Sequence, residues 1–121
     1  MKIPEEIEHG RNDELVLDCD FEIQDTADAN GLEIKYYWNV SDLVYQWVPY
    51  RSAPQALGIL KDRLDLSYKV TDDAQTMFRA MKIKRISPEL SGLYTCKISS
   101  FLSEDTQSKK MIIYGEHFSY I

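Results

Sequence analysis

Long apolar stretches are missing from this chain of 121 residues, and so is an excess of basic residues. No segment approaches the 18 consecutive apolar residues that a membrane-spanning helix needs. Residues 1–6 lack the apolar core of a secretory signal, so we expect no signal peptide in this chain. Lys and Arg number 14 against 20 Asp and Glu, which gives a formal net charge of −6. Phosphate backbones and anionic lipids repel such a protein, so we expect no nucleic-acid partner and no direct membrane binding.

Residues that carry out catalysis or bind metals are also scarce. The two histidines, His9 and His117, lie near opposite ends of the chain, and we expect both on the surface. No nucleophile-elbow, phosphate-loop or zinc-ligand spacing occurs. Asp18 and Asp20 form a carboxylate pair, but they flank Cys19 in a strand-like run and are expected to point outward into solvent. The sequence therefore predicts no enzyme, no cofactor and no metal site.

What the chain has instead is a series of short runs in which apolar and polar residues alternate. The expected strands are residues 3–7, 14–23, 32–38, 43–48, 63–70, 77–86, 92–100 and 108–114, and residues 56–60 form a further edge strand if they pair. We expect a kink that brings Ile86 to the inner face beside Met81 and Ile83, and an exposed loop at 101–107. Length and composition predict one domain over residues 1–114, with 115–121 as a tail or linker.

Two cysteines lie in the segments with the most specific motifs. Residues 90–96 read Leu-Ser-Gly-Leu-Tyr-Thr-Cys, so that a tyrosine stands two residues before Cys96 and just after a Ser-Gly turn. Residues 17–21 alternate around Cys19. Together with Ile34-Lys35-Tyr36 and with Met81-Lys82-Ile83 followed by Ile86, these motifs resemble those of V-set immunoglobulin domains over residues 3–114. More loosely, residues 34–49 resemble the single V domains of Beaten path-like neuronal recognition proteins.

The V-set resemblance implies an all-β fold, a two-sheet antiparallel Greek-key sandwich of the immunoglobulin variable type with 8–9 strands. It also implies a disulfide between Cys19 and Cys96, for which two buried thiols are the alternative. A disulfide persists only in an oxidising compartment, so we expect the extracellular part of a cell-surface or secreted protein rather than a cytosolic protein with reduced cysteines. Asn39-Val40-Ser41 fits this location, because it is an N-glycosylation acceptor sequence in an expected hairpin turn.

The resemblance also assigns residues to the core. Tyr94 is expected to form the tyrosine corner that immunoglobulin sandwiches share. The family usually packs a tryptophan against the disulfide; here the register favours Tyr36, whose hydroxyl then needs a partner, with Trp38 on the same face. The aspartate that usually precedes Ser-Gly is Leu90, so the usual salt bridge to an arginine is not expected for Arg63. The last strand lacks the Gly-x-Gly bulge of antigen receptors, which argues against that class.

Aromatic residues near the third strand predict a docking face. Tyr37 points outward if Tyr36 points inward, and the next strand exposes either Tyr45 and Trp47 or Val44 and Val48. The alternative is that residues 49–60 cover these side chains. The residues expected to contact a partner are Tyr37, Tyr45, Trp47 and Lys97, with Phe101 and Leu102 at a loop tip.

These observations predict an extracellular recognition or adhesion module without catalysis, which docks its partner through the face of one sheet. The expected partner is another cell-surface or secreted protein of immunoglobulin type, and homodimerisation through the same face is a variant. The alternative is a structural spacer domain in a multidomain ectodomain, with no ligand of its own. A glycan on Asn39 would restrict how a partner approaches the face.

Overall fold

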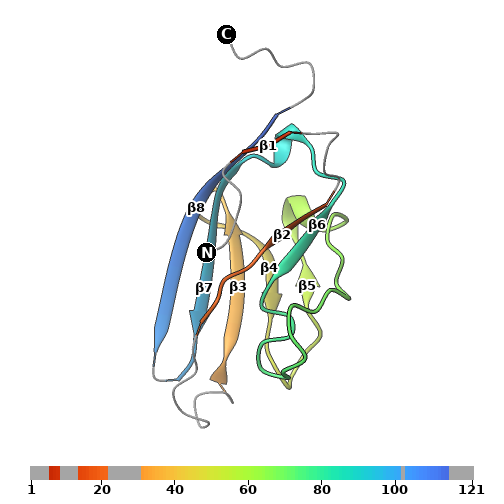
Figure 1. Cartoon of the computed structure of the whole chain (residues 1–121). Coiled ribbons are helices and arrows are strands. Elements are labelled where there is room, and N and C mark those ends of the chain that lie inside the picture. Colours follow the sequence, from red (N-terminus) through yellow and green to blue (C-terminus); the bar gives the residue numbers. More distant parts are fainter. Residues whose placement is uncertain (1–5, 9–13, 22–30, 102, 115–121) are drawn as a thin grey trace.

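The structure is a computed structural model that describes residues 6–8, 14–21, 31–101 and 103–114. Within these residues eight strands form two sheets, which Figure 1 shows as two layers with β2 and β6 in front of the larger sheet. The strands are β1 (Glu6–Glu8), β2 (Glu14–Leu17), β3 (Glu33–Trp38), β4 (Asp42–Trp47), β5 (Gln55–Ala56), β6 (Met81–Lys84), β7 (Gly92–Ser99) and β8 (Glu104–Tyr114). Two short 3-10 helices are η2 (Gly58–Leu60) and η3 (Pro88–Leu90).

The larger sheet has the order β1-β8-β7-β3-β4-β5, and the smaller sheet pairs β2 with β6. β1 runs parallel to β8, while the other pairs are antiparallel. This arrangement confirms the expected two-sheet sandwich. Ile3, Pro4 and the predicted tail at 115–121 lie outside the described residues, so the domain boundary at 114 stays a prediction.

A disulfide joins the two sheets through the core. Cys19 follows β2 and Cys96 lies in β7, with 6.4 Å between their α-carbons, a separation that a disulfide spans without moving the backbone. Both cysteines are fully buried among apolar side chains from the two sheets. The predicted pairing is therefore confirmed.

A tyrosine, Tyr36, stands at the centre of this core, where the V-set resemblance leads to the expectation of a tryptophan. Tyr36 stands opposite Cys96 in the β3–β7 ladder and is fully buried. Its hydroxyl oxygen lies 2.7 Å from the carbonyl oxygen of Arg79 and 3.2 Å from that of Leu17. The hydroxyl thus has the hydrogen-bond partner that its burial requires, a backbone carbonyl group of the opposite layer. Burial also raises the pKa of Tyr36 well above its ordinary value.

The tyrosine corner forms as expected, because the buried Tyr94 hydroxyl donates to the carbonyl of Leu90 at 2.6 Å. Trp38 is partly buried beside it, and its indole N–H donates to the carbonyl of Ser91 at 3.2 Å. Gly92 has to be glycine here. A β-carbon at this position would lie 2.6 Å from Trp38 Nε1 and 2.6 Å from Asn39 Oδ1.

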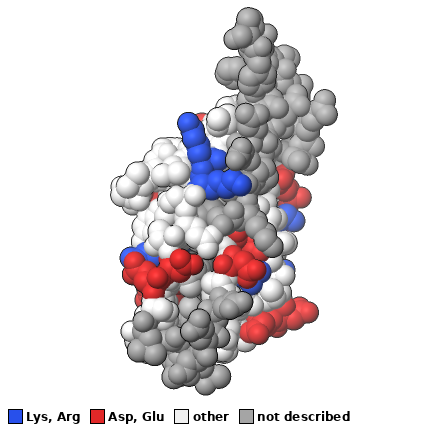
Figure 2. All heavy atoms as spheres, turned by 60° about the vertical axis from the view of Figure 1, so that its left-hand side comes forward, with Lys and Arg blue, Asp and Glu red and all other residues white. Residues whose placement is uncertain are grey.

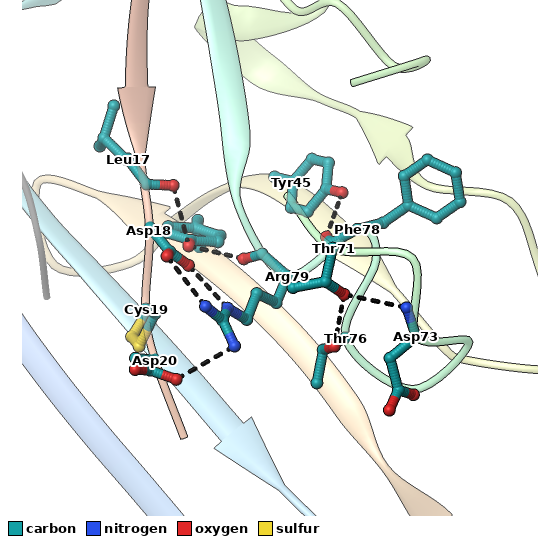
Figure 3. Close-up of polar contacts among 12 residues, drawn as sticks. Leu17, Asp18, Cys19, Asp20, Tyr45, Thr71, Asp73, Thr76, Phe78 and Arg79 are labelled. Atoms are coloured by element: carbon teal, nitrogen blue, oxygen red, sulfur yellow. Dashed lines mark hydrogen bonds and ion pairs between the residues drawn. A yellow bond between two sulfur atoms is a disulfide. The ribbon is translucent and has the colours of Figure 1, made fainter. Parts of the chain in front are cut away.

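Arg79 holds two carboxylates next to the disulfide (Figure 3). Its guanidinium donates to both oxygens of Asp18, at 2.9 and 3.1 Å, and lies 3.0 Å from Asp20 Oδ1. The expectation that Asp18 points into solvent was wrong: its exposed fraction is 8% because the arginine lies over it. The hydrogen bonds to Asp18 raise the pKa of Arg79 above its ordinary value.

A second arginine contact corrects the expectation for Arg63. Its guanidinium pairs with Glu89 at 3.3 Å, and it also donates to the carbonyl of Arg85 at 2.6 Å and to Ser87 Oγ at 3.0 Å. Arg63 therefore does form a salt bridge, with the carboxylate of the residue before Leu90. Arg85 has a φ of 52°, and this left-handed residue makes the kink that buries Ile86 as predicted.

Several strand boundaries differ from the prediction. Residues 63–70 form one isolated bridge, Leu64 to Ile83, instead of a strand. The chain turns just after it, because the Asp65 carboxylate accepts from both the N–H and the hydroxyl of Ser67. β6 starts only at Met81, and residues 56–60 divide between the short β5 and η2. β8 starts at Glu104, inside the segment expected to be a loop.

Candidate functional site

The face of β4 that points outward is set by a change of register in its ladder with β3. Tyr36 stands opposite Tyr45, but Tyr37 stands opposite Leu43, so that Val44 is an extra residue in β4. Such a bulge interrupts the alternation of side chains. Val44 and Tyr45 are both buried, and so is Trp47 two residues further on.

The prediction that Tyr45 and Trp47 contact a partner was therefore wrong, because both belong to the core, with exposed fractions of 2% and 3%. The Tyr45 hydroxyl donates to the carbonyl of Phe78 at 2.6 Å. The Trp47 ring meets the Phe78 ring edge to face, with 5.4 Å between centroids. Desolvation raises the pKa of the Tyr45 hydroxyl far above its ordinary value.

Val44 is not exposed either, so neither of the two expected registers holds. The N–H of Leu57 donates to the carbonyl of Val44 at 2.9 Å, and a β-carbon added at Gly58 would lie 3.7 Å from Val44 Cγ1. Val48 is partly buried. Residues 57 and 58 therefore lie next to Val44, in agreement with the alternative that residues 49–60 cover part of β4.

The ladders of β3 with β4 and β7 identify the side chains that remain outside. Tyr37 stands between Leu43 and Thr95, and Lys35 stands between Gln46 and Lys97. These positions alternate with the buried Tyr36 and Cys96, so they point away from the core. Each of them is partly exposed. The outer face is defined here as the following residues: Lys35, Tyr37, Leu43, Gln46, Leu93, Thr95 and Lys97.

Polar contacts surround the apolar part of the outer face. Thr95 Oγ1 and Ser108 Oγ are 2.8 Å apart, and the Gln46 amide donates to the side chain of Gln55 at 2.6 Å. Lys35 pairs with Glu33 at 3.6 Å and Lys97 with Glu104 at 3.5 Å. Exposed ion pairs of this kind are weak, so the lysines remain able to change partners. Tyr37 and Lys97 do lie on adjacent strands, as the sequence predicted.

The turn between β3 and β4 exposes a further apolar side chain. Val40 is 76% exposed and has a φ of 80°. The N–H of Ser41 donates to the carbonyl of Asn39 at 3.0 Å, which closes a three-residue turn around Val40. A γ-turn with positive φ is rare and strained, and a β-branched residue is poorly suited to it.

Asn39 is fixed to β7 at the same turn. Its N–H donates to the carbonyl of Leu93 at 2.9 Å, and its side-chain oxygen accepts from the N–H of Leu93 at 3.3 Å. The residue is exposed, so its side chain is accessible. Glycosylation of Asn39 stays a prediction.

The opposite end of the sheet carries a separate feature around Phe101, which is 73% exposed. A small pocket of about 70 Å³ is lined by Gly31, Glu33, Val48, Arg51 and Phe101. The Phe101 ring lies over Gly31, where an added β-carbon would be 2.6 Å from it. Leu102 lies outside the described residues. Phe101 is therefore exposed as expected, but at the other end of the sheet from Val40.

Charge on the molecule is mixed rather than concentrated. In the view of Figure 2, acidic side chains form separate groups, and basic side chains lie among and above them. The part of the chain that the structure describes contains no group of three His, Cys, Asp or Glu side chains able to hold a metal ion. It also contains no helix long and apolar enough to cross a membrane.

Sequence comparisons match nothing: no protein-family model and no curated protein matches the chain. Solved structures do. The chain is similar to the human B7-H4 IgV-like domain, with a TM-score of 0.66 and 14% identity, over 92% of this chain and 91% of that one. It is similar to a structure from a study of the multimeric cell-adhesive interactions of VGSC beta subunits, with a TM-score of 0.62 and 17% identity, over 89% and 88%.

A third similar structure is murine CEACAM1b, with a TM-score of 0.64 and 12% identity over 93% of this chain. The chain spans about half of that protein, namely 51%. At these identities the likeness establishes the fold, which is the variable-type immunoglobulin sandwich that the cysteine and tyrosine motifs predicted.

Three residues of this region were missed in the sequence: Leu43, Leu93 and Val40. Leu93 could have been found, because it alternates with Tyr94 and so shares a face with Thr95. Leu43 could not, because only the bulge at Val44 turns it outward. Val40 was seen as part of a glycosylation motif, and its exposed apolar side chain was overlooked.

Proposed function

We propose that this domain is an extracellular recognition module that docks an immunoglobulin-type domain of another protein through the outer face, without catalysis. The observation that carries the proposal is the apolar group on the outer face: Tyr37 stands opposite Leu43, and Leu93 lies two residues before Thr95, which is the β7 residue opposite Tyr37. The adjacent turn exposes a further apolar side chain, that of Val40. A partly exposed tyrosine on a rigid sheet loses little side-chain entropy on binding and is a frequent anchor of protein interfaces.

The strain at Val40 supports the same surface. A glycine would relieve the positive φ, and a polar residue would suit 76% exposure better. The sequence keeps an apolar, β-branched side chain there at a cost in stability. Retained strain of this kind is common at binding sites.

The rim of the outer face suits a protein partner of mixed charge. Lys35 and Lys97 lie side by side on β3 and β7, and each has an acidic neighbour on the protein surface. Exposed charges around an apolar centre steer association and set the orientation of the partner. A face of this kind buries about 800 Å² per partner in a standard interface.

The disulfide and the similar structures support the location and the class of function. A disulfide between buried cysteines fits an oxidising compartment, which favours an ectodomain. One similar structure comes from a study of multimeric cell-adhesive interactions of VGSC beta subunits. Adhesion between ectodomains is therefore a function that this fold supports.

The test is a binding screen of the domain, displayed as a multimer, against a panel of purified cell-surface ectodomains. Tyr37→Glu places a charge at the centre of the outer face and should weaken any genuine interaction about tenfold or more. The matched control is Val16→Glu in the smaller sheet, which the outer face does not include. Val16 is partly exposed on β2 and pairs with Lys82 of β6. This variant should bind like the wild type.

Two results would overturn the proposal. One is a partner whose binding Val16→Glu abolishes and Tyr37→Glu leaves unchanged. The other is the absence of any ectodomain partner across a comprehensive panel, which would favour the spacer domain. Thermal unfolding of both variants controls for loss of fold.

A further inference from the structure

We propose that the protein partner of the outer face places a carboxylate group, from one of its Asp or Glu side chains, against Lys35 and Lys97. This inference rests on the proposed function and names the chemistry of the partner at one point of its surface. Two observations carry it: the order of charged rows across the sheet, and the two like charges that stand opposite each other on β3 and β7.

The outward side chains of β3, β7 and β8 form rows across the sheet, because each ladder joins residues that point to the same side. Neighbouring rows on one side are two residues apart along a strand, which is about 7 Å. From the end of the sheet near Phe101, the first row has Glu33 and Glu104, the second has Lys35 and Lys97, and the third has Tyr37.

The two lysines are directly opposed in the β3–β7 ladder. In an antiparallel pair the β-carbons of opposed residues lie about 4.5–5.5 Å apart, and like charges at this distance destabilise the strands. A neutral polar residue at either position would remove the repulsion. The chain instead has an ammonium group at both positions, next to the tyrosine that forms the centre of the outer face.

The carboxylates of the domain itself compensate these charges only weakly. Lys35 Nζ lies 3.6 Å from Glu33, and Lys97 Nζ lies 3.5 Å from Glu104. The glutamate side chains are 45% and 57% exposed, so water screens both contacts. Both glutamates lie on the side of the lysine row that is farther from Tyr37, so a carboxylate approaching over Tyr37 reaches the lysines from the other side.

A partner that docks on Tyr37 also covers the lysine row. A standard interface of about 800 Å² per partner extends about 16 Å from its centre, and the lysine row is about 7 Å away. Covering an ammonium group without supplying an opposite charge is unfavourable, because the group loses water and gains nothing in exchange. The lysine pair therefore favours a partner with a carboxylate at this point and rejects a neutral or basic surface.

The lysines can leave their own glutamates at little cost. Arg51 lines the same small pocket as Glu33, so a second cation lies near that carboxylate when Lys35 turns to the partner. Glu104 is exposed and stays hydrated without Lys97. A sulfated polysaccharide fits this site less well than a single carboxylate, because a long polyanion would also meet the acidic row and a domain with a formal net charge of −6.

The test repeats the ectodomain screen with variants of the lysine pair, using the disulfide-bonded 121-residue chain and the same panel of purified cell-surface ectodomains. Lys35→Glu and Lys97→Glu each place a negative charge opposite the partner carboxylate, and each should weaken binding about tenfold or more. Binding of the wild type should also weaken as salt rises, and Lys35→Met combined with Lys97→Met should reduce this salt dependence.

Lys84→Glu is the matched control, because it changes the net charge by the same amount at a partly exposed position of β6 in the smaller sheet. It should bind like the wild type, which separates a local contact from the field of the whole molecule. The substituted lysines are all partly exposed, so thermal unfolding of each variant should resemble that of the wild type.

Charge exchange with the partner is the decisive step. Each Asp and Glu on the contact surface of a partner found in the screen is changed to Lys, one at a time. At least one of these partner variants should bind the wild-type domain poorly and regain binding to Lys35→Glu or Lys97→Glu. Such a rescue measures a direct coupling between the two positions, which a merely structural role of the lysines would not produce.

The inference is wrong, while the proposed function remains, if Tyr37→Glu abolishes binding and both lysine reversals leave it unchanged. It is also wrong if the reversals weaken binding and no charge exchange restores it. Lysine-dependent binding to heparin at about 150 mM salt would identify a polyanion as the ligand instead, and lysine-dependent binding of the domain to itself would identify a second copy. If no ectodomain binds at all, the proposed function and this inference both fail.

Discussion

Tyr36→Phe removes one hydroxyl from the core, at a position where this fold usually has a tryptophan. The substitution tests whether that hydroxyl stabilises the fold. The ring stays in place against the disulfide, so packing is conserved. The substitution removes the hydroxyl group that donates to the carbonyl of Arg79 at 2.7 Å. The same hydroxyl lies 3.2 Å from the carbonyl of Leu17. Both carbonyl groups stand at the meeting of the two sheets, where water has little access.

The magnitude follows from the burial of the hydroxyl. A buried polar group left without its partner costs about 1–3 kcal/mol, and the complete burial of Tyr36 argues for the middle of this range, about 2 kcal/mol. For a domain of this size that corresponds to a fall of roughly 6–10 °C in the thermal midpoint. Equilibrium unfolding in urea, followed by tryptophan fluorescence, measures the change directly.

Tyr37→Phe is the matched control, because it removes the same hydroxyl one residue further along β3, on the outer face. Substitutions at such surface positions usually change stability by no more than about 0.5 kcal/mol. If both variants lose the same stability, the contacts of Tyr36 with the two carbonyl groups do not stabilise the fold, and the account of the core is wrong.

Two further predictions concern the core and the surface. Trp47→Ala should destabilise the domain by about 3–5 kcal/mol, because the indole is buried against Phe78, and a loss below about 1 kcal/mol in urea unfolding would contradict that placement. The Glu89 carboxyl should titrate below its ordinary pKa of 4.5 in an NMR experiment, because hydrogen bonds from Ser87 and its own backbone N–H, and then Arg63, favour the charged form. Since folding lowers this pKa, the carboxylate stabilises the fold at neutral pH, and this stabilisation is lost as the pH falls through the lowered pKa. If Glu89 titrates unchanged in Arg63→Met, the arginine does not contribute to the lowered pKa.

The sandwich could be predicted because its signals are local and steric. Gly92 is fixed by contact with Trp38 and Asn39, Tyr94 by its bond to Leu90, and both lie within the motif around Cys96. Ile86 was expected to need a kink, and Arg85 makes it.

The site could be predicted only in part because one extra residue in β4 decides it. Val44 has no partner position in β3, and this places Leu43 and Tyr45 on opposite faces of the sheet, although they are two residues apart. The identities of these residues carry no sign of a bulge. The prediction that Asp18 is exposed failed for a different reason. Its partner Arg79 stands 61 residues later in the chain, so only the folded structure brings the two side chains together.

The most direct test of recognition through the outer face is hydrogen–deuterium exchange of the domain with and without a partner found in the ectodomain screen. The account predicts slower exchange on binding in the segments around Tyr37, Leu43 and Leu93, with β2 and β6 unchanged. Protection confined to β2 and β6, with β3, β4 and β7 unaffected, would contradict it.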